Sequence, residues 1–224
     1  SARPGSDTAF EVGQMKVGRR LATKILNASR FALLQAEPRG EVTQPLDRAM
    51  LESMAALVTF ATEKLEAYDY AAVLDQVEKS FWTFCDDYIE LVKGRRYGDF
   101  GAEGAGSANT ALTTALSVYL RLFAPYLPFV TEEVWSWWQD GSVHRASWPT
   151  PDEIEGRGRA GLYLEASQVL GDVRRQKSLN GWKTKTPVNV VVVADAARLA
   201  RIRLVEQDLR AAVSASTGTF RQGG

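Results

Sequence analysis

The side chains best suited to chemistry lie between residues 16 and 31. A helical wheel at about 100° per residue brings three cations, an amide and a phenyl ring within an arc of about 80°. These are Lys16, Arg20, Lys24, Asn27 and Phe31, with Arg19 and Arg30 flanking them. Cations bind phosphates without reading a sequence, whereas an aromatic ring can stack on a base and an amide can hydrogen-bond to its edge. The pattern indicates a nucleic-acid contact; the alternative is a solvated basic helix with Phe31 buried.

A second basic cluster surrounds Trp182. Its cations are Arg174, Arg175, Lys177, Lys183 and Lys185. No acidic residue occurs between Asp172 and Asp195. The cluster falls in an expected connection between a helix and a strand, where a loop can meet a ligand. We expect either a second ligand contact here or a mobile, highly charged loop.

Residue types that build catalytic sites are scarce. One histidine and one cysteine in 224 residues cannot assemble a multi-ligand Cys/His zinc site. The single Cys85 allows no internal disulfide and fits a reducing compartment. The glycines of residues 98–109 form neither a P-loop nor a Rossmann pattern, and we expect a loop there. Asp86, Asp87 and Glu90 have no evident partner base, so acid/base catalysis is not favoured.

The charge is unevenly distributed, although 27 basic and 27 acidic residues give a net charge of zero. The terminal blocks are basic: residues 1–36 carry +4 and residues 158–224 carry +6. The central blocks are acidic, with −7 over residues 37–105 and −3 over residues 106–157. Such asymmetry suggests contact with a polyanion, although a solvated charged face gives the same pattern. It excludes a uniformly basic coat.

Helical periodicity dominates the chain as far as residue 138. Apolar residues at alternating spacings of three and four predict helices over residues 46–68, 70–91 and 108–124, followed by one that begins at Pro128. Beyond residue 150 the sequence predicts a linker, a helix over 162–178, a strand over 188–193, a helix over 196–212 and a strand over 217–221. The expected fold is mainly α: a helical bundle (1–150), a linker (151–161) and a small α/β appendage (162–224).

Membrane insertion and secretion are both unsupported. The sequence has no apolar run of the roughly 18 residues that a transmembrane helix needs, and no basic-then-apolar leader pattern at its N-terminus. We therefore expect a cytoplasmic location. As a separate expectation, the chain is a monomer.

Three segments resemble the C-terminal part of the valyl-tRNA synthetases, a class I aminoacyl-tRNA synthetase family. They are GQMKVGRRLATKILNASRF at 13–31, AYDYAAVLDQVEKSFWTFCDDYIELVKGR at 67–95 and LRLFAPYLPFVTEEVW at 120–135. A further match is the pair Trp148 and Pro149. The matches span most of residues 8–150 in the family's order and spacing.

The resemblance implies an α-helical anticodon-binding domain followed by a small α/β portion near the tRNA stem. In the family, the segment that corresponds to Asn27–Phe31 faces the anticodon loop, and its aromatic ring stacks on a base. The Trp182 cluster would then be a possible tRNA-stem contact. The expected partners are valine tRNA, through its anticodon arm, and the catalytic domain of the same polypeptide.

The sequence departs from the whole enzyme of that family. The HIGH motif of class I synthetases needs two histidines, whereas this chain has one, and no KMSKS-like loop occurs. We therefore expect no catalytic site and no cofactor in this chain, with ATP and magnesium needed only by a full-length ligase. Two other functions stay open: a helical module that packs on the catalytic domain, and a free-standing synthetase-like scaffold that does not bind RNA.

Overall fold

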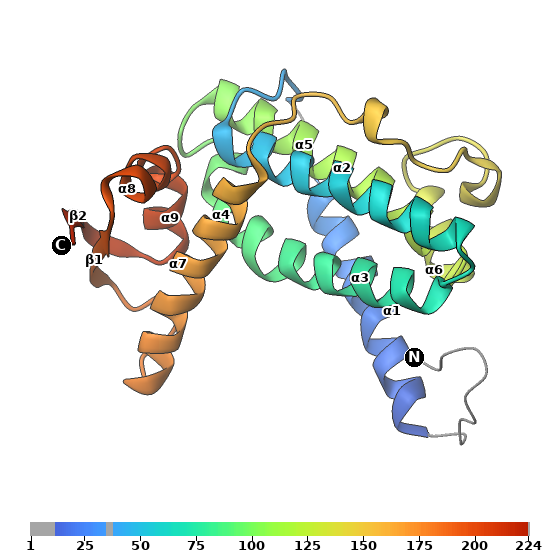
Figure 1. Ribbon diagram of the computed structural model, residues 1–224, viewed down its shortest axis with the longest axis horizontal. Coiled ribbons are helices and arrows are strands. Elements are labelled where there is room, and N and C mark those ends of the chain that lie inside the picture. Colours follow the sequence, from blue (N-terminus) through green and yellow to red (C-terminus); the bar gives the residue numbers. More distant parts are fainter. Residues whose placement is uncertain (1–11, 35–37, 224) are drawn as a thin grey trace. The chain divides into compact units, whose positions relative to one another are not determined.

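A computed structural model of the chain describes residues 12–34 and 38–223 (Figure 1). Its helices are α1 (Val12–Leu33), α2 (Pro45–Glu66), α3 (Tyr70–Thr83), α4 (Ile89–Arg96), α5 (Ala102–Phe123), α6 (Pro128–Trp135), α7 (Ala160–Leu179), α8 (Ala196–Arg203) and α9 (Glu206–Ala212). Its strands are β1 (Val188–Ala194) and β2 (Ala215–Gln222). Short turns of other helix types are η1 (Phe84–Tyr88, a π-helical turn), η2 (Val143–Arg145) and η3 (Pro151–Glu153). The predicted fold class, mainly α with a small α/β appendage, is confirmed.

Packing groups the described residues into two compact units. The first unit comprises residues 12–34, 54–82 and 112–154, and the second comprises residues 38–53, 83–111 and 155–223. The boundaries interleave along the chain and fall within α2, α3 and α5. The division into 1–150, 151–161 and 162–224 follows the sequence instead, and it stays a prediction.

The core of the first unit is built from the apolar stripes of its helices. In α1, Leu21, Ile25 and Ala32 are buried as the periodicity predicts, whereas Val17 near the start of the helix is exposed. The ring of Phe81 packs edge to face on those of Tyr119 and Phe123, at centroid distances of 5.1 and 5.4 Å. Aromatic pairs in this arrangement stabilise beyond the area that they bury. α1 therefore has one docked face, and its basic face is left outside the core.

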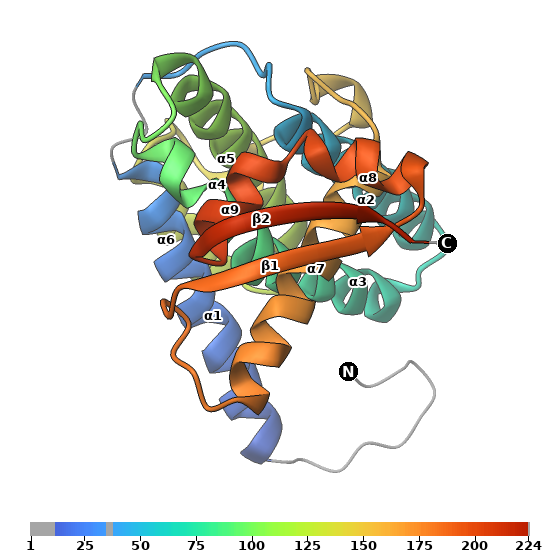
Figure 2. The same cartoon turned by 90° about the vertical axis from the view of Figure 1, so that its left-hand side faces the viewer.

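The second unit contains a small parallel sheet. β1 and β2 pair in parallel, with Asn189 opposite Thr217 and Val193 opposite Arg221. Parallel strands need a crossover connection, and α8 and α9 supply it, running alongside the two strands (Figure 2). Asp195 begins the crossover, because its carboxylate accepts a hydrogen bond of 2.8 Å from the backbone N–H of Arg198 and caps α8.

A loop over all of residues 98–109 was the wrong expectation, because α5 begins at Ala102. Glycine weakens an isolated helix, but here it allows close packing. A Cβ at Gly106 would lie 3.1 Å from the backbone nitrogen of Gly40, and one at Gly104 would lie 3.0 Å from the side chain of Arg95. Tertiary packing of these glycines therefore overrides their low helix propensity.

Two other predicted helices are interrupted. The stripe that begins at Tyr70 passes through the π-helical turn η1 before it continues as α4. The helix expected over 196–212 is divided into α8 and α9 by a turn at Leu204 and Val205. Neither break contains proline or glycine, so the sequence carries no signal for them.

Candidate nucleic-acid interface

Five of the seven side chains predicted on the first helix line one surface groove of the first unit. The groove is formed by Lys16, Arg19, Arg20, Thr23, Lys24, Asn27 and Trp82. The cations and Asn27 come from successive turns of α1, and Trp82 comes from α3. All five predicted residues are exposed except Lys24, which is half-buried. We call this feature the α1 groove.

Trp82 lies beneath two of the groove's cations. The guanidinium carbon of Arg20 is 5.0 Å from the centroid of the indole ring, and the amino nitrogen of Lys24 is 5.3 Å from it. Both distances fall within the range of cation–π attraction. The indole N–H donates a hydrogen bond of 3.2 Å to the carboxylate of Glu78, one helical turn earlier in α3. The ring is thus oriented on one side by a carboxylate and covered by two cations.

Arg30 and Phe31 lie at the C-terminal end of α1 and are not among the residues that line the groove. The guanidinium carbon of Arg30 is 5.9 Å from the centroid of Trp137, just after α6. The indole N–H of Trp137 donates a hydrogen bond of 3.0 Å to Glu133. Phe31 is half-buried, so it is neither fully exposed nor enclosed in the core.

The five cations around Trp182 have different environments in the second unit. Arg174 donates to the backbone oxygen of Asp86 at 2.7 Å and to the carboxylate of Asp87 at 3.2 Å. Arg175 pairs with Asp172 at 3.2 Å on the exposed surface of α7. Burial raises the pKa of the Asp87 carboxyl, and the charge of Arg174 opposes that shift.

Lys177 differs from the expectation of a surface cation. Its side chain is only 4% exposed. Its amino group donates to the backbone oxygens of Thr184 at 2.6 Å and Val213 at 2.7 Å, and desolvation lowers its pKa. It therefore ties the connection after α7 to the residues before β2. Lys183 and Lys185 are exposed, as predicted.

A group of interacting ionisable side chains is buried within the second unit. Arg95 donates to Asp47 at 2.6 and 2.8 Å and to Asp208 at 3.0 Å through two nitrogens. Tyr88 and Ser107 also donate to Asp47, at 2.8 and 2.6 Å. We call these five side chains the Arg95 network.

The network perturbs the pKa values of its members in a manner that fits a structural role. Burial alone would lower the pKa of Arg95, but its hydrogen bonds to Asp47 and the nearby carboxylate charges raise it. Burial raises the pKa of Tyr88 and of Asp208, although Arg95 partly offsets the effect on Asp208. The side chains of the network are buried, and the positive charge of Arg95 is balanced by the carboxylates of Asp47 and Asp208. This arrangement stabilises the fold.

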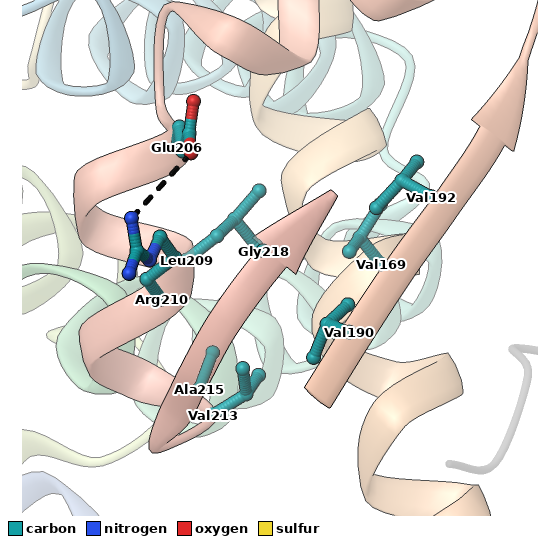
Figure 3. A pocket seen from close by; sticks show the side chains of 9 residues that line it. All are labelled: Val169, Val190, Val192, Glu206, Leu209, Arg210, Val213, Ala215 and Gly218. Atoms are coloured by element: carbon teal, nitrogen blue, oxygen red, sulfur yellow. Dashed lines mark ion pairs between the residues drawn. The ribbon is translucent and has the colours of Figure 1, made fainter. Parts of the chain in front are cut away.

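A small pocket of the second unit is lined mainly by apolar side chains (Figure 3). Val190 and Val192 of β1 and Val169 of α7 face it, and Glu206 and Arg210 of α9 form an ion pair of 3.8 Å beside it. The lining lacks the convergent polar groups that fix a polar ligand. The pocket is a packing gap beneath the sheet.

The structure brings together no metal ligands among the residues that it describes. The described part of the chain contains no group of three or more histidine, cysteine, aspartate and glutamate side chains placed to hold a metal ion. His144 is exposed, and its Nε2 lies 3.1 Å from the backbone oxygen of Pro128. Over residues 12–34 and 38–223, every helix is too short or too polar to cross a bilayer.

The first unit thus presents cations and an amide along one face of α1, with the indole ring of Trp82 from α3 beneath two of the cations. The chain matches the model of the anticodon-binding domain of tRNA ligases over residues 47–192, and it belongs to that family. It is 49% identical over 228 residues to the valine-tRNA ligase of Cutibacterium acnes, which covers 100% of this chain and 26% of that protein.

Two further relatives give the same result. The chain is 49% identical over 236 residues to the valine-tRNA ligase of Salinispora tropica (95% of this chain, 27% of that protein). It is 48% identical over 229 residues to that of Thermobifida fusca (98% and 26%). The chain spans about a quarter of the length of these curated relatives. The resemblance to valyl-tRNA synthetases is confirmed, although the family model begins after α1.

Sequence reasoning missed the tryptophans that back the basic face of α1. Trp82 follows Phe81 in α3 but lies outside the apolar stripe of that helix, and Trp137 follows α6. Each has a glutamate four residues earlier, Glu78 and Glu133. That spacing places the two side chains on one helix face and could have indicated that they interact. The sequence does not show that α1 packs against the rings.

Proposed function

We propose that this chain recognises the anticodon arm of valine tRNA as part of a valine-tRNA ligase. The observation that carries the proposal is the α1 groove, which brings four cations and one amide onto one surface beside an aromatic ring. RNA recognition combines phosphate contacts, stacking on aromatic side chains and hydrogen bonds to splayed bases. The family and the ligase relatives support the same partner.

Each residue of the basic face has an assigned role in the proposal. Phosphates are held by Lys16, Arg19, Arg20, Lys24 and Arg30. Asn27 is exposed in the groove and hydrogen-bonds to a base or sugar. Phe31 stacks on a base with the part of its ring that is not buried. The cations supply affinity, whereas Asn27 and Phe31 distinguish an unpaired loop from a duplex.

The second basic cluster contributes a weaker contact with the tRNA stem. Lys183 and Lys185 are its exposed members, and Arg174 and Arg175 are each engaged with a carboxylate. Lys177 has no direct role because it is buried. The chain needs no cofactor to bind RNA; ATP and magnesium serve the adenylation chemistry of the whole ligase. It acts as a monomer in the cytoplasm, linked to the catalytic domain of the same polypeptide.

The direct test is fluorescence anisotropy of the chain with a labelled stem-loop carrying the valine anticodon, with a stem-loop of changed anticodon as the control. We expect tighter binding to the valine stem-loop and a strong decrease in affinity as salt rises. The logarithm of the binding constant should fall with the logarithm of salt concentration with a slope of about −0.7 per neutralised phosphate of a single strand. Equal binding to both stem-loops would contradict anticodon recognition.

A helical module that packs on the catalytic domain is the competing function. In its favour, Phe129 at the start of α6 is 89% exposed and Tyr68 after α2 is 82% exposed. Exposed aromatic residues are common in protein interfaces. If the chain binds neither stem-loop at low salt but co-purifies with a separately expressed catalytic domain, this second function replaces the first.

A further inference from the structure

The same arrangement of a glutamate and a tryptophan occurs twice beneath the basic face of α1. In α3, Glu78 accepts a hydrogen bond from the indole of Trp82; in α6, Glu133 accepts one from the indole of Trp137, which lies just after that helix. In both cases the two residues are four positions apart and at least one cation of α1 lies over the ring. We call each arrangement a Glu–Trp bracket.

The Trp82 bracket reduces the repulsion between two cations of α1. Arg20 and Lys24 are one helical turn apart, and like charges at that spacing repel each other. The face of an indole ring is electron-rich and attracts cations, more strongly than phenol or benzene rings do. Because both cations lie over Trp82, at 5.0 and 5.3 Å from its centroid, the ring offsets their repulsion.

The ring holds the two cations without cancelling their charge. A carboxylate in the place of the ring would neutralise the charge that a phosphate needs. Trp82 attracts Arg20 and Lys24 without carrying a net charge, and the carboxylate of Glu78 is bonded to the indole N–H. That hydrogen bond fixes the ring plane, since a buried or half-buried indole N–H needs an acceptor.

We propose that Trp82 is a positioning residue that holds Arg20 and Lys24 as a preformed two-cation clamp for one phosphate group of the RNA backbone. The inference rests on the proposed function and adds a residue to it. Trp82 does not stack on a base, because the ring already lies under two cations. The clamp reduces the loss of side-chain freedom on binding, since two long side chains are already confined.

The Trp137 bracket performs the same task for one cation. Arg30 lies 5.9 Å from the ring centroid, farther than either cation over Trp82. We therefore expect it to contribute less than the Trp82 bracket. Arg30 belongs to the segment Asn27–Phe31 of α1. Trp137 would therefore hold Arg30 close to the phosphates that flank the stacked base.

The test measures binding of the stem-loop with the valine anticodon to the 224-residue chain and to Trp82→Leu and Trp82→Phe variants. Trp82→Leu should weaken binding about fivefold to tenfold, and Trp82→Phe by a smaller factor because it keeps a ring face. Phe129→Leu removes an exposed ring outside the groove and should leave affinity unchanged. Thermal unfolding confirms that each variant is folded, and Trp82→Phe keeps the test decisive if Trp82→Leu does not fold.

A double-mutant cycle separates positioning from direct contact. In an Arg20→Ala/Lys24→Ala background, Trp82→Leu should change affinity by less than about twofold, because interacting residues are not additive. An undiminished loss in that background would mean that Trp82 contacts RNA itself and would overturn the clamp. Unchanged affinity of Trp82→Leu alone, while the parent chain binds, would also overturn it and leave the proposed function intact.

The proposed function can fail separately. If the parent chain binds no stem-loop at low salt, the proposed function and the clamp are both wrong. Side-chain proton NMR then reports on the arrangement itself: upfield ring-current shifts of the Arg20 and Lys24 methylene protons, lost in Trp82→Leu, would show that the bracket exists without serving RNA.

Discussion

Basic side chains have opposite environments in the two units of this chain. In the second unit, Arg95 is 3% exposed and donates to two carboxylates. In the first unit, Arg20 is exposed and has the ring of Trp82 as its close neighbour. The net charge of zero over the whole sequence hides this difference.

The comparison teaches how the partner of a cation decides what the cation can do. A carboxylate cancels the charge, so Arg95 holds the interior together and presents no field to a polyanion. An aromatic ring carries a quadrupole and no net charge, so Arg20 stays attractive to phosphate while its orientation is restrained. We expect substitutions in the second unit to change stability, and substitutions on α1 to change RNA affinity.

Arg95→Ala should have the largest effect. It would leave the carboxylates of Asp47 and Asp208 buried without their cation, and breaking one partner of a buried pair costs about 3–5 kcal/mol. Urea denaturation followed by circular dichroism measures the loss in the free energy of unfolding. Lys93→Ala, an exposed lysine in the same helix α4, is the matched control and should change it by less than about 0.5 kcal/mol. Equal effects of the two variants would contradict the assigned role of the network.

Phe31→Ala tests the other side of the comparison. If the ring stacks on a base, its removal should cost about 1–3 kcal/mol of binding, or roughly one to two decades in affinity. Anisotropy with the anticodon stem-loop measures the change, and Phe129→Ala is the control because it removes an exposed ring of α6 to which no RNA contact is assigned. Unchanged affinity in a folded Phe31→Ala chain would rule out the stacking role.

Much of the fold could be predicted from local patterns. Periodic apolar residues located the long helices, and the valine run after Pro187 located β1. The predicted cations of α1 share one groove because they lie on successive turns of one helix. Such features depend on residues that are close in sequence, which is why they could be read without a structure.

Features that depend on distant residues could not be predicted. The packing of Gly106 against Gly40 turned an expected loop into the start of α5. Lys177 is charged and lies beside a basic loop, yet it is buried and donates to the backbone oxygens of Thr184 and Val213. Trp82 is a half-buried residue of α3, and only the approach of α1 makes it part of the groove. In each case the decisive neighbour comes from another element.

Salt dependence distinguishes the two exposed basic clusters. Replacing Lys16 and Arg19 together by alanine should reduce the slope of log affinity against log salt by about 1.4 if each neutralises a phosphate of a single strand. The matched Lys183→Ala/Lys185→Ala chain should change the slope for the stem-loop by less, and should show a loss only with whole valine tRNA. Identical slopes for the two double variants would mean that the α1 groove is not the main phosphate contact.

The smallest expected effect is the contribution of Asp208 to the pH dependence of the free energy of unfolding. Arg95 faces two carboxylates, Asp47 and Asp208, and the Tyr88 hydroxyl donates to Asp47. Burial raises the pKa of Asp208 in the folded chain above its unfolded value of about 3.9. As pH falls through the raised folded pKa, the folded state takes up the proton first, so this group increases the free energy of unfolding on acidification.

Asp208→Asn removes that titration and retains one acceptor for Arg95. The difference in unfolding free energy between the parent and Asp208→Asn should therefore grow in favour of the parent as pH is lowered from 7 toward 4, by an amount on the order of 1 kcal/mol or less. Urea denaturation at a series of pH values measures it, and the half-buried Asp87, whose pKa is also raised, cancels because both chains contain it. A difference that shrinks on acidification would show that the charge of Arg95 outweighs burial and lowers the pKa of Asp208. The network would then stabilise the second unit most at neutral pH, and the contrast with the neutral rings under α1 would be sharper still.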